Sequence, residues 1–174
     1  MDVVTQYFNA ERAESVFFIA VGLTAITAAA ICFFIIKKPF SNGLASTLAV
    51  IAVLQLVVGI TIHQRSPKDA QRVHLMIASA PDRIASEEVP RMQIVMRNFK
   101  VYLAVEVVLF LISLLVLVLV WAVPGGFWWG AAIGLALQSS LTAVLDVIAT
   151  QRGAAYLDWL LLQTGDVFSK SLQH

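Results

Sequence analysis

Residues 101–150 decide the fold, because VYLAVEVVLFLISLLVLVLVWAVPGGFWWGAAIGLALQSSLTAVLDVIAT consists of two long apolar runs on either side of Pro124-Gly125-Gly126. Each run is close to the ~20 residues that an α-helix needs to cross ~30 Å of hydrocarbon. Proline and glycine are typical of the turn between two such helices. Each run also carries one carboxylate, Glu106 in the first and Asp146 in the second. The stretch therefore predicts two membrane spans joined by a short turn, with an acid on each.

Two further apolar runs precede this stretch, which gives predicted spans at about 15–36, 44–62, 101–123 and 127–150. The composition agrees with this prediction, since 59% of the 174 residues are hydrophobic and 13% are charged. Soluble domains have about 45–50% apolar and about 25% charged residues. The sequence thus predicts an all-α, polytopic membrane protein. We expect one membrane domain of four transmembrane helices, arranged as two antiparallel hairpins.

The segments outside the spans predict short helices. The first residues favour an interfacial helix with Asn9 as its N-cap. Ser66-Pro67 and Pro90 each look like a helix start inside a cytoplasmic, helical segment at about 63–100. Residues 154–163 are apolar but too short to span a membrane, so they predict an interfacial helix or an extension packed on 63–100.

The basic residues predict the orientation. All Lys and Arg residues except Lys37 and Lys38 fall on the side shared by the N-terminus, the 63–100 segment and the C-terminus. Basic loops stay in the cytoplasm. We therefore expect both termini of this multi-pass protein to be cytoplasmic.

The two acids define the candidate site. Glu106 and Asp146 lie at nearly equal sequence distances from the turn, so they are expected at one depth, near the cytoplasmic side. Ionisable groups inside spans are costly and usually face other helices or a path for ions. The candidate residues of this polar layer are Glu106, Asp146, His63, Tyr102, Gln138, Thr142 and Gln55. Their role could be a structural lock, an ion or proton pathway, or a site for a small polar ligand.

Small residues predict where helices pack. Gly130 and Gly134 form a G-x-x-x-G pair, which lets two helix backbones approach closely in lipid. The sequence does not say which helix is the partner.

Several classes of function find no support in the sequence. It has no glycine-rich phosphate loop, no G-x-S-x-G, no C-x-x-C and no H-E-x-x-H, so no set of catalytic residues is predicted. Neither a cofactor nor a metal site is expected. Cys32 is the one cysteine, which excludes a disulfide within the chain. The net charge of +1 gives no basic field for nucleic acid.

Residues 88–99 (EVPRMQIVMRNF) and 127–138 (FWWGAAIGLALQ) give the chain its one family resemblance. It resembles small four-span bacterial inner-membrane proteins of unassigned function, over most of its length. The resemblance implies a bacterial cytoplasmic membrane as the setting and assigns no residue a role.

The predicted function is association in the lipid bilayer rather than catalysis. The protein would act as a homo-oligomer, as an accessory subunit, or as an immunity-type protector against a membrane-acting toxin. The alternative is an oligomeric channel or transporter for a proton, an ion or a small polar solute through the Glu106 and Asp146 layer. Four spans are too few to enclose a large pore alone, so this alternative requires several copies.

Overall fold

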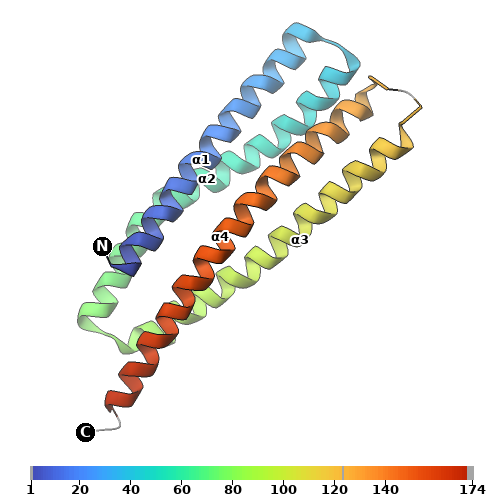
Figure 1. Ribbon diagram of the computed structural model, residues 1–174. Helices are drawn as coiled ribbons and strands as arrows, with labels where there is room; N and C mark the ends of the chain where they lie inside the picture. The colour runs from blue at the N-terminus through green and yellow to red at the C-terminus, as the bar shows by residue number, and fades with distance from the viewer. Residues whose placement is uncertain (1, 123, 172–174) are drawn as a thin grey trace.

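The computed structural model describes residues 2–122 and 124–171, with residues 166–171 described by their backbone alone. Its elements are α1 (Val3–Ala30), η1 (Ile31–Ile36), α2 (Pro39–Ser79), η2 (Ile84–Glu88), α3 (Val89–Leu119) and α4 (Phe127–Ser171), where η marks a π-helical turn (Figure 1). No strand occurs in these residues, which confirms the all-α class. Four helices are long and apolar enough to cross a membrane, which indicates a multi-pass membrane protein.

Helix α1 shows how local chemistry sets the element boundaries. Asp2 caps its start, since the Asp2 carboxylate accepts a hydrogen bond of 2.7 Å from the Thr5 amide. Asn9, the predicted cap, therefore lies inside the helix. The first helical stretch ends as predicted for the span 15–36, since Lys37 takes a left-handed conformation with φ 54°. Helix α2 begins at Pro39, five residues before the predicted start of the second span at 44.

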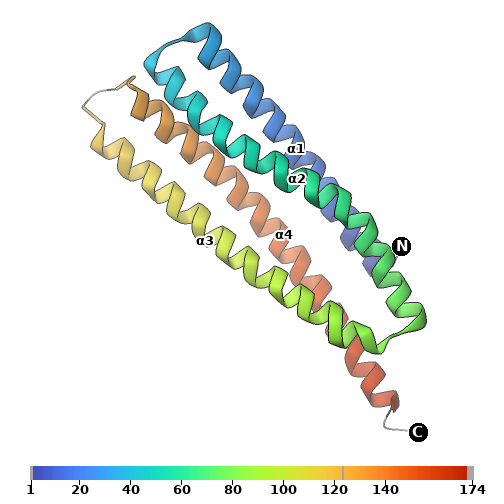
Figure 2. The same cartoon turned by 180° about the vertical axis from the view of Figure 1, so that it is seen from behind.

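The helices are arranged in the order α1, α2, α4, α3. Helix α1 packs along α2, α2 along α4, and α4 along α3 (Figures 1 and 2). The backbones of α1 and α3 do not approach each other in the described residues. One end of the molecule holds the start of α1, the end of α4 and the connection from α2 to α3; we call it the terminal end. The connections from α1 to α2 and from α3 to α4 lie at the opposite end, the turn end.

Helices α2 and α4 are much longer than a membrane is thick. They contain 41 and 45 residues, and at about 1.5 Å per residue each exceeds ~60 Å. Pro67 lies inside α2, so the predicted helix start at Ser66-Pro67 is wrong. Residues 154–163 are continuous with α4, so the structure favours the predicted extension over a separate interfacial helix. These long helices form a second packed region beyond the predicted spans.

Glycines join α2 to α4 at the turn end. A Cβ on Gly130 would lie 1.9 Å from the Phe40 carbonyl oxygen, and a Cβ on Gly43 would lie 1.9 Å from the Phe127 carbonyl oxygen. No side chain fits either position, so the two backbones touch there. Gly134 continues the contact, with Leu44 and Thr47 around it. Helix α2 is therefore the partner of the predicted Gly130 and Gly134 pair.

The apolar core lies at the terminal end, outside the predicted spans. Its buried members come from the start of α1, the end of α2, the beginning of α3 and the last third of α4. They are Val4, Tyr7, Phe8, Val73, Met76, Ile84, Val89, Met92, Tyr156 and Leu160. Burial of apolar surface drives folding where water is the solvent. This position is thus consistent with a terminal end that stands in water.

Candidate functional site

Two of the predicted polar residues form a buried pair between α2 and α4. The Gln55 side-chain amide donates a hydrogen bond of 3.1 Å to the Gln138 side-chain oxygen. Both side chains are almost fully buried, with 3% and 4% of their residue surface exposed. The Gln55 oxygen has no hydrogen-bond partner in the described structure. The pair links two helices, as predicted for an amide in the middle of a span.

The two predicted acids also lie together. Glu106 of α3 faces Asp146 and Thr142 of α4. One carboxylate oxygen of Glu106, Oε2, is buried without a hydrogen-bond partner in the described residues. The Thr142 hydroxyl donates instead to the Gln138 carbonyl of its own helix, at 2.9 Å. The acids are therefore neighbours at one depth, and Glu106 is left incompletely satisfied.

A third acid joins these two from α1. Asp146 faces Glu14, and the Glu14 carboxylate forms an ion pair with Arg152 of α4. Glu106, Asp146, Glu14 and Arg152 thus form one row from α3 to α1, which we call the boundary row. It contains three carboxylates and one guanidinium. Such a row can carry a proton or bind a cation, and it can equally fix the helices to one another.

His63 and Tyr102 do not take part in the boundary row. The His63 Nδ1 atom lies 3.3 Å from the Ser15 hydroxyl oxygen, so this ring joins α2 to α1. Tyr102 is 53% exposed and makes no hydrogen bond among the described residues. The predicted layer is therefore divided into the Gln55–Gln138 pair, the boundary row and a separate His63 contact.

A buried carboxylate at the terminal end organises a further polar cluster. Glu88 has no exposed surface. Its Oε1 accepts from Arg91 Nη2 at 2.6 Å, and its Oε2 accepts from Arg72 Nη2 at 3.0 Å. The Tyr156 hydroxyl donates to Oε1 at 3.3 Å. These contacts bring α2, α3 and α4 together around one charge, and we call them the Glu88 cluster.

The side chains around this cluster are held by apolar and aromatic contacts. The rings of Tyr7 and Tyr156 stack with their centroids 4.2 Å apart. Burial raises the pKa of both phenols above their usual range, and nearby carboxylates add to the effect. Hydrogen bonds to Glu88 outweigh the effect of burial on Arg91 and raise the pKa of its guanidinium. At neutral pH the phenols of Tyr7 and Tyr156 are therefore uncharged, and the Arg91 guanidinium is charged.

The sequence gives only weak signs of the Glu88 cluster. Glu88 lies shortly before Pro90, where an acid is expected at the start of a helix. The helix dipole stabilises an acid at that position, so the sequence gives no reason to expect an arginine partner. Tyr156 lies in the apolar segment 154–163, and Arg72 lies 16 residues before Glu88 in the 63–100 segment. Only the packing of α4 against that segment brings the three together. The described residues contain no group of His, Cys, Asp and Glu side chains suited to a metal ion.

Comparison of the chain with known protein families, with curated proteins and with solved structures finds no match.

Proposed function

We propose that this protein works by association with another membrane protein, a second copy of itself first of all, and not by catalysis. In this proposal it crosses a bacterial inner membrane four times, as two antiparallel hairpins, with the terminal end in the cytoplasm. The distribution of Lys and Arg supports this orientation, because all of them except Lys37 and Lys38 lie on that side. An accessory subunit or an immunity-type protector would use the same kind of contact.

The observation that carries the proposal is the poor coverage of α3. Among residues 101–119 of this helix only Ser113 is buried. Helix α4 is its one close helical neighbour along this length. Glu106 of the same helix faces α4, so the uncovered surface of α3 is apolar. An apolar helix face with one neighbour gains packing contacts when a second helix associates with it in the membrane.

Cysteine cross-linking in intact membranes tests the proposal. Cys32 is first replaced by serine, so that the chain carries no other thiol. Leu111→Cys then places a thiol on α3, and Leu54→Cys is the matched control on α2. Leu111 is 57% exposed and Leu54 is 61% exposed, and each lies near the middle of a predicted span. Under oxidation we expect a covalent dimer from the α3 thiol and little from the α2 thiol. Equal dimer from both positions, or none from α3, would contradict self-association through α3.

Transport of a proton, an ion or a small polar solute is the second candidate, and the boundary row favours it. Incompletely paired acids in a span are common along ion pathways. The test is flux through liposomes that contain the purified protein. If transport is the function, Glu106→Gln with Asp146→Asn abolishes the flux while the protein stays folded. If no flux occurs in the wild type, this candidate is wrong and association is left.

A further inference from the structure

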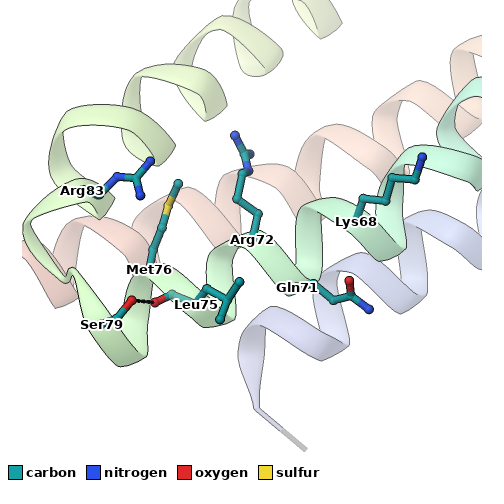
Figure 3. Close-up of a pocket in the computed structure, with 7 residues that line it drawn as sticks. All are labelled: Lys68, Gln71, Arg72, Leu75, Met76, Ser79 and Arg83. Atoms are coloured by element: carbon teal, nitrogen blue, oxygen red, sulfur yellow. Dashed lines mark hydrogen bonds between the residues drawn. The ribbon is translucent and has the colours of Figure 1, made fainter.

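A pocket of about 290 Å³ opens at the terminal end, between α2 and the connection to α3 (Figure 3). Its lining comes from one face of α2 and from the residue that precedes η2. The lining residues are Lys68, Gln71, Arg72, Leu75, Met76, Ser79 and Arg83. Three of these side chains are cations and none is an acid. Carboxylates outside the lining pair with the two arginines, and Lys68 has no acidic partner among the described residues, so an anionic ligand fits the lining itself.

Carboxylates outside the pocket hold its two arginines in place. Glu87 accepts from Arg83 Nε at 2.8 Å and from Arg83 Nη2 at 3.0 Å. Glu88 accepts from Arg72 Nη2 at 3.0 Å, and the Asp69 carboxylate lies 3.6 Å from the same nitrogen. The Arg72 Nε atom is buried and has no acceptor in the described structure. Figure 3 shows Arg72 and Arg83 on the same side of the chain, with Met76 between them. The guanidiniums are thus ordered before any ligand arrives, and each has further N–H groups to donate.

Lys68 completes the set. Its side chain is exposed and forms no ion pair among the described residues. Lysine and arginine side chains commonly bind phosphate groups, because a phosphate carries up to two negative charges and several acceptor oxygens. One lysine and two arginines line this pocket. Leu75 and Met76 supply apolar surface beside the cations. The lining therefore fits an anion that carries a small apolar part.

We infer that this pocket binds a small, water-soluble, phosphate-bearing molecule. A lipid headgroup has the same chemistry, but the pocket lies beyond the predicted end of the span on α2. Lys68 follows the predicted end of the span at residue 62 by about 9 Å of helix, and the other lining residues of α2 lie beyond it. The site is separate from α3, so it goes beyond association and does not depend on it.

Calorimetric titration of the full chain with inorganic pyrophosphate tests the inference. The protein is held in nanodiscs of zwitterionic lipid, at constant ionic strength. We expect one saturable site, and about tenfold weaker binding for Lys68→Gln and for Arg83→Gln, because each removes one charged contact. Arg97→Gln is the matched control, since Arg97 is exposed and forms no ion pair in the described residues. This control is expected to bind as the wild type does.

Two results would overturn the inference. One is the absence of saturable binding, or an equal loss in the Arg97→Gln control, which would show attraction to net charge alone. The other comes from nanodiscs with anionic phospholipid. If these lipids displace pyrophosphate in the wild type, the pocket takes a lipid headgroup and not a soluble ligand. Lys68 and Arg83 are both exposed, so neither change should alter the midpoint of thermal unfolding, which is measured on every variant.

Discussion

Glu88 is the residue with the largest expected effect on stability. Its carboxylate is buried and accepts hydrogen bonds from Arg72, Arg91 and Tyr156. Glu88→Gln removes the charge and keeps the size, so Arg72 and Arg91 lose their nearest counter-ion and keep only the longer contacts to Asp69, at 3.6 and 3.9 Å. Loss of one partner of a buried ion pair costs on the order of 3 kcal/mol. We expect a clear fall in the free energy of unfolding, measured by denaturant titration in mild detergent.

The neighbouring acid provides the control for this change. Glu87 pairs with Arg83 at the surface, with 42% of its side chain exposed. Surface ion pairs contribute little to stability, so Glu87→Gln should leave the unfolding midpoint nearly unchanged. An equal effect of the two changes would contradict the central position of Glu88 in the terminal end.

Tyr7 and Tyr156 give a prediction for alkaline pH. Burial raises the pKa of both phenols, so the folded chain keeps their protons at a pH where the unfolded chain loses them. Stability is therefore complete below the unfolded pKa of about 10 and falls as the pH rises above it. Tyrosinate absorbance should show two late ionisations in the folded protein, one of which disappears in Tyr7→Phe and one in Tyr156→Phe. Ionisation of both residues near pH 10 without unfolding would contradict their burial.

At the level of single residues, the sequence predicts the depth of a side chain along its helix. It does not predict which neighbouring helix that side chain faces. The turn at 124–126 gave Glu106 and Asp146 a common depth, and they are neighbours. Gln55 and Gln138 were both candidates for the polar layer, and they bond to each other. His63 and Tyr102 were expected in the same layer; His63 contacts Ser15 of α1, and Tyr102 is 53% exposed. Rotation about a helix axis depends on packing against the next helix, which counting along the chain does not include.

At the level of elements, the contact of α2 with α4 depends on two glycines. Gly130→Ala places a Cβ within 1.9 Å of the Phe40 carbonyl oxygen, so the helices must separate. Overpacking of this kind costs about 1–3 kcal/mol or more. We expect a lower midpoint of thermal unfolding in detergent for this variant.

The same helix offers a control glycine. A Cβ on Gly165 meets nothing within 4 Å, and alanine is favoured over glycine inside a helix. Gly165→Ala should therefore leave the midpoint unchanged or slightly higher. If Gly130→Ala were equally harmless, α2 and α4 would not cross as described.

Helix boundaries followed the sequence only where no tertiary contact opposed them. The first helical stretch ends at Lys37, as predicted for the span 15–36, whereas α2 begins at Pro39, before the predicted start at 44. Pro67 begins no new helix, although a proline inside a helix costs about 3 kcal/mol. Buried Val73 and Met76 beyond it anchor the same helix in the core, and their packing offsets that cost. Gly153 also lies inside α4, where a Cβ would come 2.9 Å from the Met96 sulfur.

At the level of the whole molecule, two different sets of forces act along the same four helices. The predicted spans are joined by glycines and by one amide pair, which are the contacts that hold helices together in lipid. The terminal end is held by an apolar core and by ion pairs, as in a soluble bundle. Composition and helix length predicted the spans. They could not predict the core, because its members come from four separate segments.

This division places the apolar core of the molecule at the terminal end and the uncovered surface on α3. In our account the pocket beside Arg72 receives a soluble ligand, whereas α3 receives a partner helix. In this account both surfaces are available at once, because the pocket faces water and the α3 surface faces lipid.

Native mass spectrometry of particles cut directly from the membrane by an amphipathic polymer tests the central claim most directly. The method keeps the protein with its lipid and with any protein bound in the membrane. We expect a complex heavier than one chain of 19.0 kDa, of twice that mass for a second copy or of another mass for a different partner. Leu111→Arg on α3 should reduce it to one chain, because a charge is costly at a contact between helices. A single chain with lipid alone, in the wild type, would contradict the account.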